Sequence, residues 1–350
     1  MSASNAMLRV LATLGNAIAV LALAQAHGAE PSIPPCMAVA PTPIVVRIGE
    51  DMPRPALLRG TASAGLEVID AETLQTLWSA AASPPASQQF QAMSALFAGS
   101  LLPIDLDGDG THDRIYAGDL AGRLWKFDLH HGSPAQQWVA GGVFGDFSSG
   151  VRGFVAPPDV SLATAVQPGT QPWFNIALGT VRTGTSAVDN RFYVLRDRSA
   201  FESWTQAQYD RQRPLRETDL VALPRLGAQL SDLSPAGYFI EIGGAEVLSP
   251  SLTISGRATL ALTEPGAAAG AACSIAVVVS SIELATGAEA GSPAAGSQPA
   301  RIALHVRAGE SFTLRREDSR ALCMLGETRV PACDVDLSAH RTWWRREDAD

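Results

Sequence analysis

The chain has 350 residues, 46% of them apolar and 17% charged, so it can bury a substantial core as one large or two modest domains. Its formal net charge of −9 argues against a nucleic-acid partner and against a polybasic surface that binds anionic membranes.

The N-terminus has the pattern of a secretory signal peptide. Arg9 precedes an apolar run over residues 10–24, and Ala24-Gln25-Ala26 offers a small-x-small cleavage site. We therefore expect residues 1–26 to be removed during export. The alternative is a retained membrane anchor, but this run is short for a membrane span, and no later stretch is long and apolar enough to cross a membrane.

The rest of the chain predicts an all-β repeat protein. Residues 27–56 are rich in Pro and Ala and are expected to form an extended N-terminal segment with one strand at most. Residues 57–340 carry four copies of a strand hairpin, in which apolar residues alternate up to an acidic residue and a Gly or Thr turn follows. The acidic residues of the four copies are Asp70, Asp128, Asp197 and Glu283.

A single hairpin cannot bury its apolar face, so the copies must share a core, as the blades of a β-propeller do. The copies are spaced more widely than the usual blade length of about 40–50 residues, which predicts insertions or unrecognised blades between them. Helical signal is weak, and the fairest helix candidate covers residues 199–212.

An acidic loop interrupts the second copy, between apolar runs that are predicted to be strands. Its carboxylates occupy loop positions 1, 3, 5 and 9 and belong to Asp105, Asp107, Asp109 and Asp113. Alternate carboxylates of a tight loop converge on one point, and hard oxygen ligands of this kind suit calcium. A metal-free Asp/Gly turn is the alternative, but four carboxylates in nine residues would repel one another without a cation.

The segment from Asp105 to Leu129 resembles the calcium-loop segment of the C-terminal propeller in the PilC/PilY family of type IV pilus tip and biogenesis proteins. Further family landmarks follow in the same order, at Ala156–Val160, Asn190–Arg198, Gly237–Phe239 and Ala245–Pro250. Together these motifs cover roughly residues 57–287, about two thirds of the chain.

The resemblance implies a modified, quinoprotein-type β-propeller that acts with minor pilins in a pilus tip complex, in pilus assembly, extension and retraction. It implies an exported protein of the periplasm, the pilus tip or the cell surface. The implied calcium ligands are the side chains of Asp105, Asp107, Asp109 and Asp113 and the carbonyl of Thr111.

The chain departs from the family pattern in three respects. The calcium loop arrives without the long N-terminal adhesive region, and no Asp-x-Ser-x-Ser metal motif occurs, so cell adhesion is not implied directly. Residues 274–277 replace a Gly-rich strand start, which implies a shortened or irregular ring.

Two other functions fit parts of this pattern. One is a secreted quinone-cofactor dehydrogenase, because such enzymes also combine Trp-closed propeller repeats with calcium. The chain has no adjacent Cys-Cys pair and no Gly-x-Ser-x-Gly elbow, and His130-His131 is expected to be a solvated turn pair, so we expect a non-enzymatic protein. The other is a generic secreted propeller that binds a ligand such as a glycan.

Export makes the four cysteines candidates for disulfide bonds. Cys323 and Cys333 bracket a Gly and Pro turn and are expected to pair, which leaves Cys36 and Cys273 as the second pair. Four cysteines allow three pairings, so this choice is a preference among them. The charged residues 341–350 are expected to form a tail.

Overall fold

A computed structural model describes residues 41–49, 51–99, 101–148, 150–163, 171–184, 189–231, 235–263, 274–289, 302–307, 312–317, 320–330 and 335–336. The chain divides into two compact units, Met1–Pro35 and Cys36–Asp350, and every described residue belongs to the second. The predicted signal peptide and the predicted tail lie outside the described residues. No helix within the described ranges is long and apolar enough to cross a membrane.

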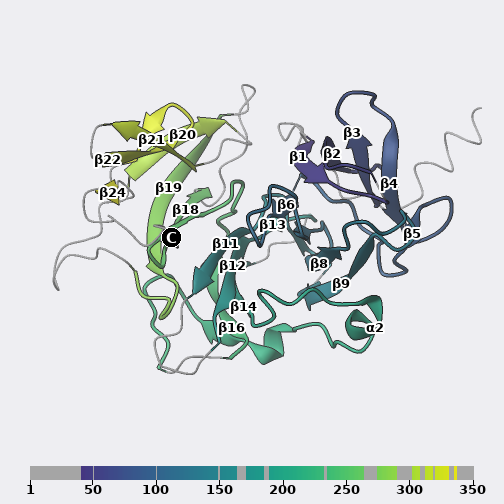
Figure 1. The fold of residues 1–350 in the computed structure, drawn as a ribbon. Coiled ribbons are helices and arrows are strands. Elements are labelled where there is room, and N and C mark those ends of the chain that lie inside the picture. The colour runs from purple at the N-terminus through teal and green to yellow at the C-terminus, as the bar shows by residue number, and fades with distance from the viewer. Residues whose placement is uncertain are drawn as a thin grey trace, which may run out of the picture. The chain divides into compact units, whose positions relative to one another are not determined.

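The regular secondary structure of the described residues is almost entirely β, with the strands arranged in small sheets (Figure 1). Sheet I has the order β1 (Thr42–Val46), β2 (Arg54–Gly60), β3 (Leu66–Asp70), β4 (Thr76–Ala81), β5 (Gln88–Gln89). Sheet II has the order β6 (Leu101–Ile104), β7 (Arg114–Gly118), β8 (Arg123–Leu129), β9 (Val139–Asp146). Sheet III has the order β11 (Asp159–Ala163), β12 (Trp173–Gly179), β14 (Asn190–Asp197), β16 (Gly237–Gly243), β15 (Val221–Leu223).

Two further sheets follow along the chain. Sheet IV has the order β17 (Leu252–Ile254), β18 (Arg257–Thr263), β19 (Ser274–Glu283), β20 (Ile302–Arg307). Sheet V contains β21 (Phe312–Glu317), β22 (Arg320–Leu325), β23 (Thr328–Arg329) and β24 (Val335–Asp336). The strands β10 (Arg152–Gly153) and β13 (Val181–Arg182) form a separate pair, and the helical pieces are α2 (Gln206–Tyr209) and a 3-10 turn (Glu217–Asp219).

The predicted repeat is confirmed, and its four copies occupy the same place in four sheets. Each copy is the third strand of its sheet, namely β3, β8, β14 and β19. The acidic residue of each copy lies in or at the end of that strand. The second and third intervals are long because the β10–β13 pair is inserted between β8 and β14, and a segment without regular blade strands is inserted between β14 and β16.

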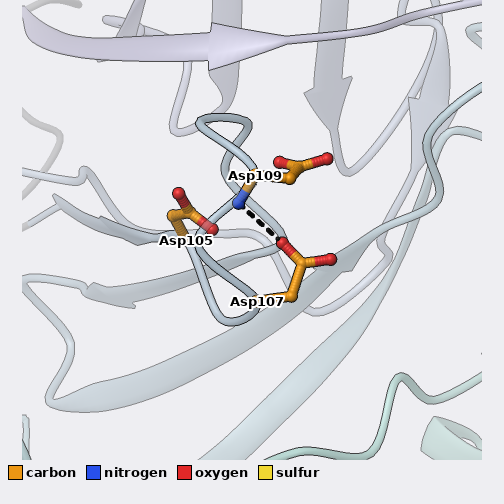
Figure 2. Close-up of side chains that lie close together, drawn as sticks. All are labelled: Asp105, Asp107 and Asp109. Atoms are coloured by element: carbon orange, nitrogen blue, oxygen red, sulfur yellow. Dashed lines mark hydrogen bonds between the residues drawn. The ribbon is translucent and has the colours of Figure 1, made fainter. Parts of the chain in front are cut away.

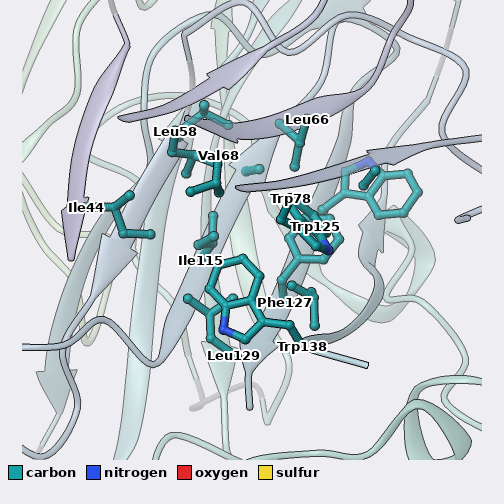
Figure 3. Close-up of a cluster of buried hydrophobic side chains, with 14 of the residues drawn as sticks. Ile44, Leu58, Leu66, Val68, Trp78, Ile115, Trp125, Phe127, Leu129 and Trp138 are labelled. Atoms are coloured by element: carbon teal, nitrogen blue, oxygen red, sulfur yellow. The ribbon is translucent and has the colours of Figure 1, made fainter. Parts of the chain in front are cut away.

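Consecutive sheets share hydrophobic cores, as expected for propeller blades. Sheets I and II bury Trp78, Trp125 and Trp138 together with aliphatic side chains (Figure 3). The rings of Trp78 and Trp138 meet edge to face with their centroids 5.5 Å apart. Separate buried clusters contain side chains of sheets II and III, of sheets III and IV, and of sheets IV and V.

Two sequence predictions differ from the structure. Sheet I starts at Thr42, inside the predicted extended segment 27–56, because Pro43 lies on an edge strand and Pro55 near the start of β2, two places where strands tolerate proline. The helix predicted over residues 199–212 shrinks to the four residues of α2. The residues before α2 are held by side chains of sheet II, as described below.

The predicted disulfide between Cys323 and Cys333 stays a prediction. Cys323 is fully buried in β22, whereas Cys333 lies outside the described residues, as do Cys36 and Cys273.

A partly buried carboxylate joins sheets III and IV. Asp159 begins β11, and its Oδ2 accepts hydrogen bonds from the hydroxyls of Ser251 (3.0 Å) and Thr253 (2.5 Å), the latter on β17. Burial raises the pKa of Asp159 from 3.8 to about 6, although both hydroxyls oppose this rise. The protonated form is therefore favoured by folding.

We expect Asp159 to make the protein more stable in mild acid than at neutral pH. Because the folded pKa lies above the unfolded one, the stabilisation is complete below pH 3.8 and is lost as the pH rises through about 6. Between pH 4 and 7 the free energy of unfolding of the wild type should fall by about 1–2 kcal/mol relative to that of Asp159→Asn. This is less than the ~3 kcal/mol that corresponds to the whole pKa shift, because the carboxylate is partly exposed. Urea unfolding at several pH values measures this, with the exposed Asp210→Asn as control; parallel wild-type and Asp159→Asn curves would contradict it.

Candidate metal centre

The acidic loop closes the hairpin between β6 and β7. Ile104, the last residue of β6, pairs directly with Arg114, the first residue of β7. Gly108 and Gly110 have φ values of +79° and +91°, a left-handed conformation that glycine adopts without strain and that the sharp turn requires. The prediction that the loop lies between two strands is confirmed.

The structure brings three of the predicted ligands together. Oxygen atoms of Asp105, Asp107 and Asp109 all lie within 4.8 Å of one another. Figure 2 shows the three side chains on the loop. The backbone N–H groups of Gly108 and Gly110 donate to the two oxygens of Asp105 at 2.7 and 2.9 Å. These bonds orient the carboxylate, and hard oxygen donors that converge in this way fit calcium.

Asp109 is favoured in its charged form. Its Oδ1 accepts hydrogen bonds from the hydroxyl and the backbone N–H of Thr111, at 2.6 and 2.7 Å. These two bonds lower the pKa of Asp109. Thr111 therefore contacts a predicted ligand through its buried hydroxyl, and the use of its carbonyl as a ligand stays a prediction.

Asp113 takes a different position from the other three carboxylates. Its Oδ2 accepts a hydrogen bond from the backbone N–H of Leu106 at 2.6 Å, which ties the end of the loop to its beginning. Its Oδ1 lies 3.5 Å from Nε2 of His131. In this conformation Asp113 closes the loop through the backbone, and its direct coordination of the ion stays a prediction.

His131 is a neighbour of the loop that sequence reasoning missed. Its side chain is only 13% exposed, so the prediction of a solvated turn residue was wrong, and its Nε2 lies 3.2 Å from the hydroxyl of Thr111. The register of the hairpin contains the signal. Arg114 pairs with Asp128, so continuing the antiparallel register by three residues on each strand places Thr111 opposite His131.

A buried cluster of charges begins at the next residue, Arg114. Its guanidinium donates to Oδ1 of Asp128 at 2.7 Å and to the carbonyls of Ala200 and Glu202 at 2.7 and 2.6 Å. Arg114 is fully buried. The residue that follows the acidic loop therefore fixes the chain after β14 onto sheet II.

Lys126, the only lysine of the chain, makes the second part of the cluster. Its Nζ lies 2.8 Å from Oδ2 of Asp197 and 2.6 Å from the hydroxyl of Ser199, and 4.7 Å from the centre of the Trp204 ring. Although burial opposes it, the charge of Lys126 lowers the pKa of Asp197, which favours the carboxylate form. Tyr116 donates a further hydrogen bond to Asp197 at 2.5 Å.

The sequence pattern places Asp128 and Asp197 at the ends of alternating apolar runs, directly before a turn. The structure shows both side chains buried and paired with cations. Their charged partners follow the period-two rule of strands, since Arg114 and Lys126 lie on one face of sheet II with Asp128. Alternating charges within otherwise apolar strands are the signal that could have identified the cluster.

Comparison with known proteins supports the fold. No family model matches the chain, and a search of curated proteins found no match. The structure is similar to the crystal structure of the PilY1 C-terminal domain of Pseudomonas aeruginosa, with a TM-score of 0.56 and 15% sequence identity, over 83% of this chain and 72% of that chain. At this identity the similarity concerns the fold alone. The chain therefore has an all-β, irregular β-propeller-like fold similar to that of the PilY1 C-terminal domain.

Proposed function

We propose that this chain is an exported, calcium-binding β-propeller protein of the type IV pilus, which acts with minor pilins in a tip or assembly complex. The observation that carries the proposal is the convergence of Asp105, Asp107 and Asp109 in the β6–β7 loop, within a fold similar to that of the PilY1 C-terminal domain. The ordered sequence landmarks support the same proposal. Asp113 and the Thr111 carbonyl would complete the set of oxygen ligands.

The proposal gives calcium a structural task. The ion would neutralise carboxylates that otherwise repel one another and would fix the register of the β6–β7–β8 hairpins. A slip of one residue there would turn Tyr116 and Trp125 to the opposite faces of sheet II. The proposal assigns no catalytic role to the chain; a bound quinone in the absorbance spectrum of the purified protein would contradict that assignment.

We expect one calcium ion to bind with a Kd of roughly 10⁻⁵ to 10⁻³ M, as in extracellular calcium modules. Asp109→Ala should weaken binding about tenfold or more, because it removes both a charge and an oxygen ligand. Asp113→Asn should also weaken binding, although asparagine keeps an acceptor for the N–H of Leu106. Calorimetry measures these affinities, with Asp146→Asn on β9 as control. Unchanged calcium uptake in the Asp105→Ala/Asp109→Ala double variant would refute the site.

Chelation of calcium should loosen the hairpin locally. We expect faster amide hydrogen exchange over residues 114–129 and a lower Tm, because unshielded carboxylates would splay the loop from which β7 departs. Exchange in β18 should change little and provides an internal reference. Equal protection of residues 114–129 with and without calcium would mean that the ion binds but does not organise the sheet.

The pilus role is tested by capture of partners. The full exported chain, immobilised in calcium, should retain minor pilins from the same organism and should release them on chelation. The Asp105→Ala/Asp109→Ala variant should fail to retain them even in calcium. Failure of the wild type to bind any minor pilin would overturn the pilus assignment without affecting the calcium site.

A further inference from the structure

A pocket of about 480 Å³ opens at the end of β14, away from the carboxylates of the acidic loop. It is formed by the last residues of β14, the segment that follows them, and Pro235 and Ala236 before β16. One wall of the pocket carries the polar and aromatic side chains of Arg198, Glu202, Trp204 and Gln212. Its size falls within the range of sites for small molecules.

The wall of this pocket is held in place before any ligand arrives. Arg114 binds the carbonyls of Ala200 and Glu202, and the backbone N–H of Trp204 donates to Oδ2 of Asp128 at 2.9 Å. The Trp204 ring is braced from another direction by Tyr209, edge to face, with the ring centroids 5.3 Å apart. A wall ordered in advance lowers the entropic cost of binding.

The pocket is lined by two arginines and two carboxylates, and one of these carboxylates, Asp197, is already paired with Lys126. Arg196 lies in β14 and Arg198 directly follows it, and their guanidinium groups are 5.5 and 5.4 Å from the centre of the Trp173 ring. Burial, and in addition the charge of Arg198, lower the pKa of Arg196. Among the described residues, no carboxylate lies within ion-pair distance of exposed Arg198. An anion near the two guanidinium groups would relieve their repulsion.

The remaining groups suit a ligand with hydroxyls and an apolar face. Trp204 is partly exposed in the pocket and offers part of its indole ring as a flat apolar surface. Glu202 and Gln212 are exposed and provide a carboxylate acceptor and an amide. A pyranose ring presents an apolar C–H face for the indole ring and several hydroxyls for the carboxylate and the amide. A sugar that also bears a carboxylate would provide a partner for the guanidinium group.

We propose that the pocket binds an acidic sugar residue, such as a uronic acid within a polysaccharide. Its carboxylate would pair with Arg198, its apolar face would lie against Trp204, and its hydroxyls would bond Glu202 and Gln212. A guanidinium presents N–H donors in a planar fork that matches a carboxylate, which gives the contact geometric specificity. The sugar proposal depends on neither calcium binding nor pilin binding. An experiment can therefore contradict one of these three proposals and leave the other two unaffected.

The test compares two sugars that differ in one group. Binding of methyl glucuronoside and of neutral methyl glucoside to the full chain is measured by calorimetry and by ligand-observed NMR, at low ionic strength. We expect the acidic sugar to bind about tenfold tighter or more, and this preference to shrink as salt is added. Equal affinities, or no binding of the acidic sugar at tens of millimolar, would overturn the proposal.

Matched variants locate the site. Arg198→Gln should remove the preference for the acidic sugar and leave the weak binding of the neutral one unchanged. Trp204→Leu should weaken both. Arg257→Gln, which removes an exposed guanidinium from β18, should change neither. An unaltered preference in Arg198→Gln would place the sugar elsewhere, and equally tight competition by a short peptide with a free C-terminal carboxylate would overturn the sugar assignment.

Discussion

Lys126→Met is expected to lower the free energy of unfolding by about 3–5 kcal/mol, although methionine has a similar length. The substitution leaves Asp197 buried without the ammonium that lies 2.8 Å from its carboxylate. It also removes the donor to the Ser199 hydroxyl and the cation beside the Trp204 ring. Urea unfolding, followed by tryptophan fluorescence, measures the loss.

A double variant separates charge from packing. Lys126→Met combined with Asp197→Asn should be clearly more stable than the sum of the two single losses predicts, because no buried charge is then left alone. Arg59→Met, which breaks an exposed pair with Glu67, serves as control and should cost less than about 1 kcal/mol. A loss below 1 kcal/mol in Lys126→Met would show that the cluster is not held by its charges.

Trp125→Ala should cost about 3–5 kcal/mol, as other large buried aromatic side chains do. The indole lies in the core shared by sheets I and II, stacked on Phe127 with ring centroids 5.8 Å apart and edge to face with Phe97. Its Nε1 donates to Oδ2 of Asp119 at 3.0 Å. Alanine would leave a cavity between the two sheets and remove that bond.

Trp125→Phe distinguishes the two parts of this loss. Phenylalanine keeps most of the packing but leaves the fully buried Asp119 with one donor fewer, so we expect a loss of about 1–3 kcal/mol. Phe201→Ala, at a phenylalanine that is 55% exposed, should cost much less. Thermal and urea unfolding measure all three variants. Equal losses for Trp125→Ala and Trp125→Phe would mean that the hydrogen bond to Asp119, and not packing, fixes this strand.

Features that depend on neighbouring residues could be predicted from the sequence. Alternation of apolar residues up to Asp70, Asp128 and Asp197 marks the third strand of three sheets, because side chains of a strand alternate between its faces. The acidic loop was predictable for the same reason, since its carboxylates and glycines lie within nine residues. Both patterns are local and need no knowledge of the tertiary structure.

Features that depend on distant residues escaped prediction. The chain after Asp197 has a polar and aromatic pattern that favours a helix. Its carbonyls at Ala200 and Glu202 instead accept hydrogen bonds from Arg114, more than eighty residues earlier, so no helical ladder forms there. The burial of His131 likewise follows from the register of a hairpin, which composition alone does not give.

The burial of the single lysine makes the folded chain almost inert to amine chemistry. Lys126 has no exposed surface, so reagents that acylate amines should modify only the α-amino group while sheets II and III stay packed. Acylation of Lys126 requires that this packing open, and its rate therefore reports the frequency of one defined opening event. Mass spectrometry can count that modification at a single known position, without any engineered label.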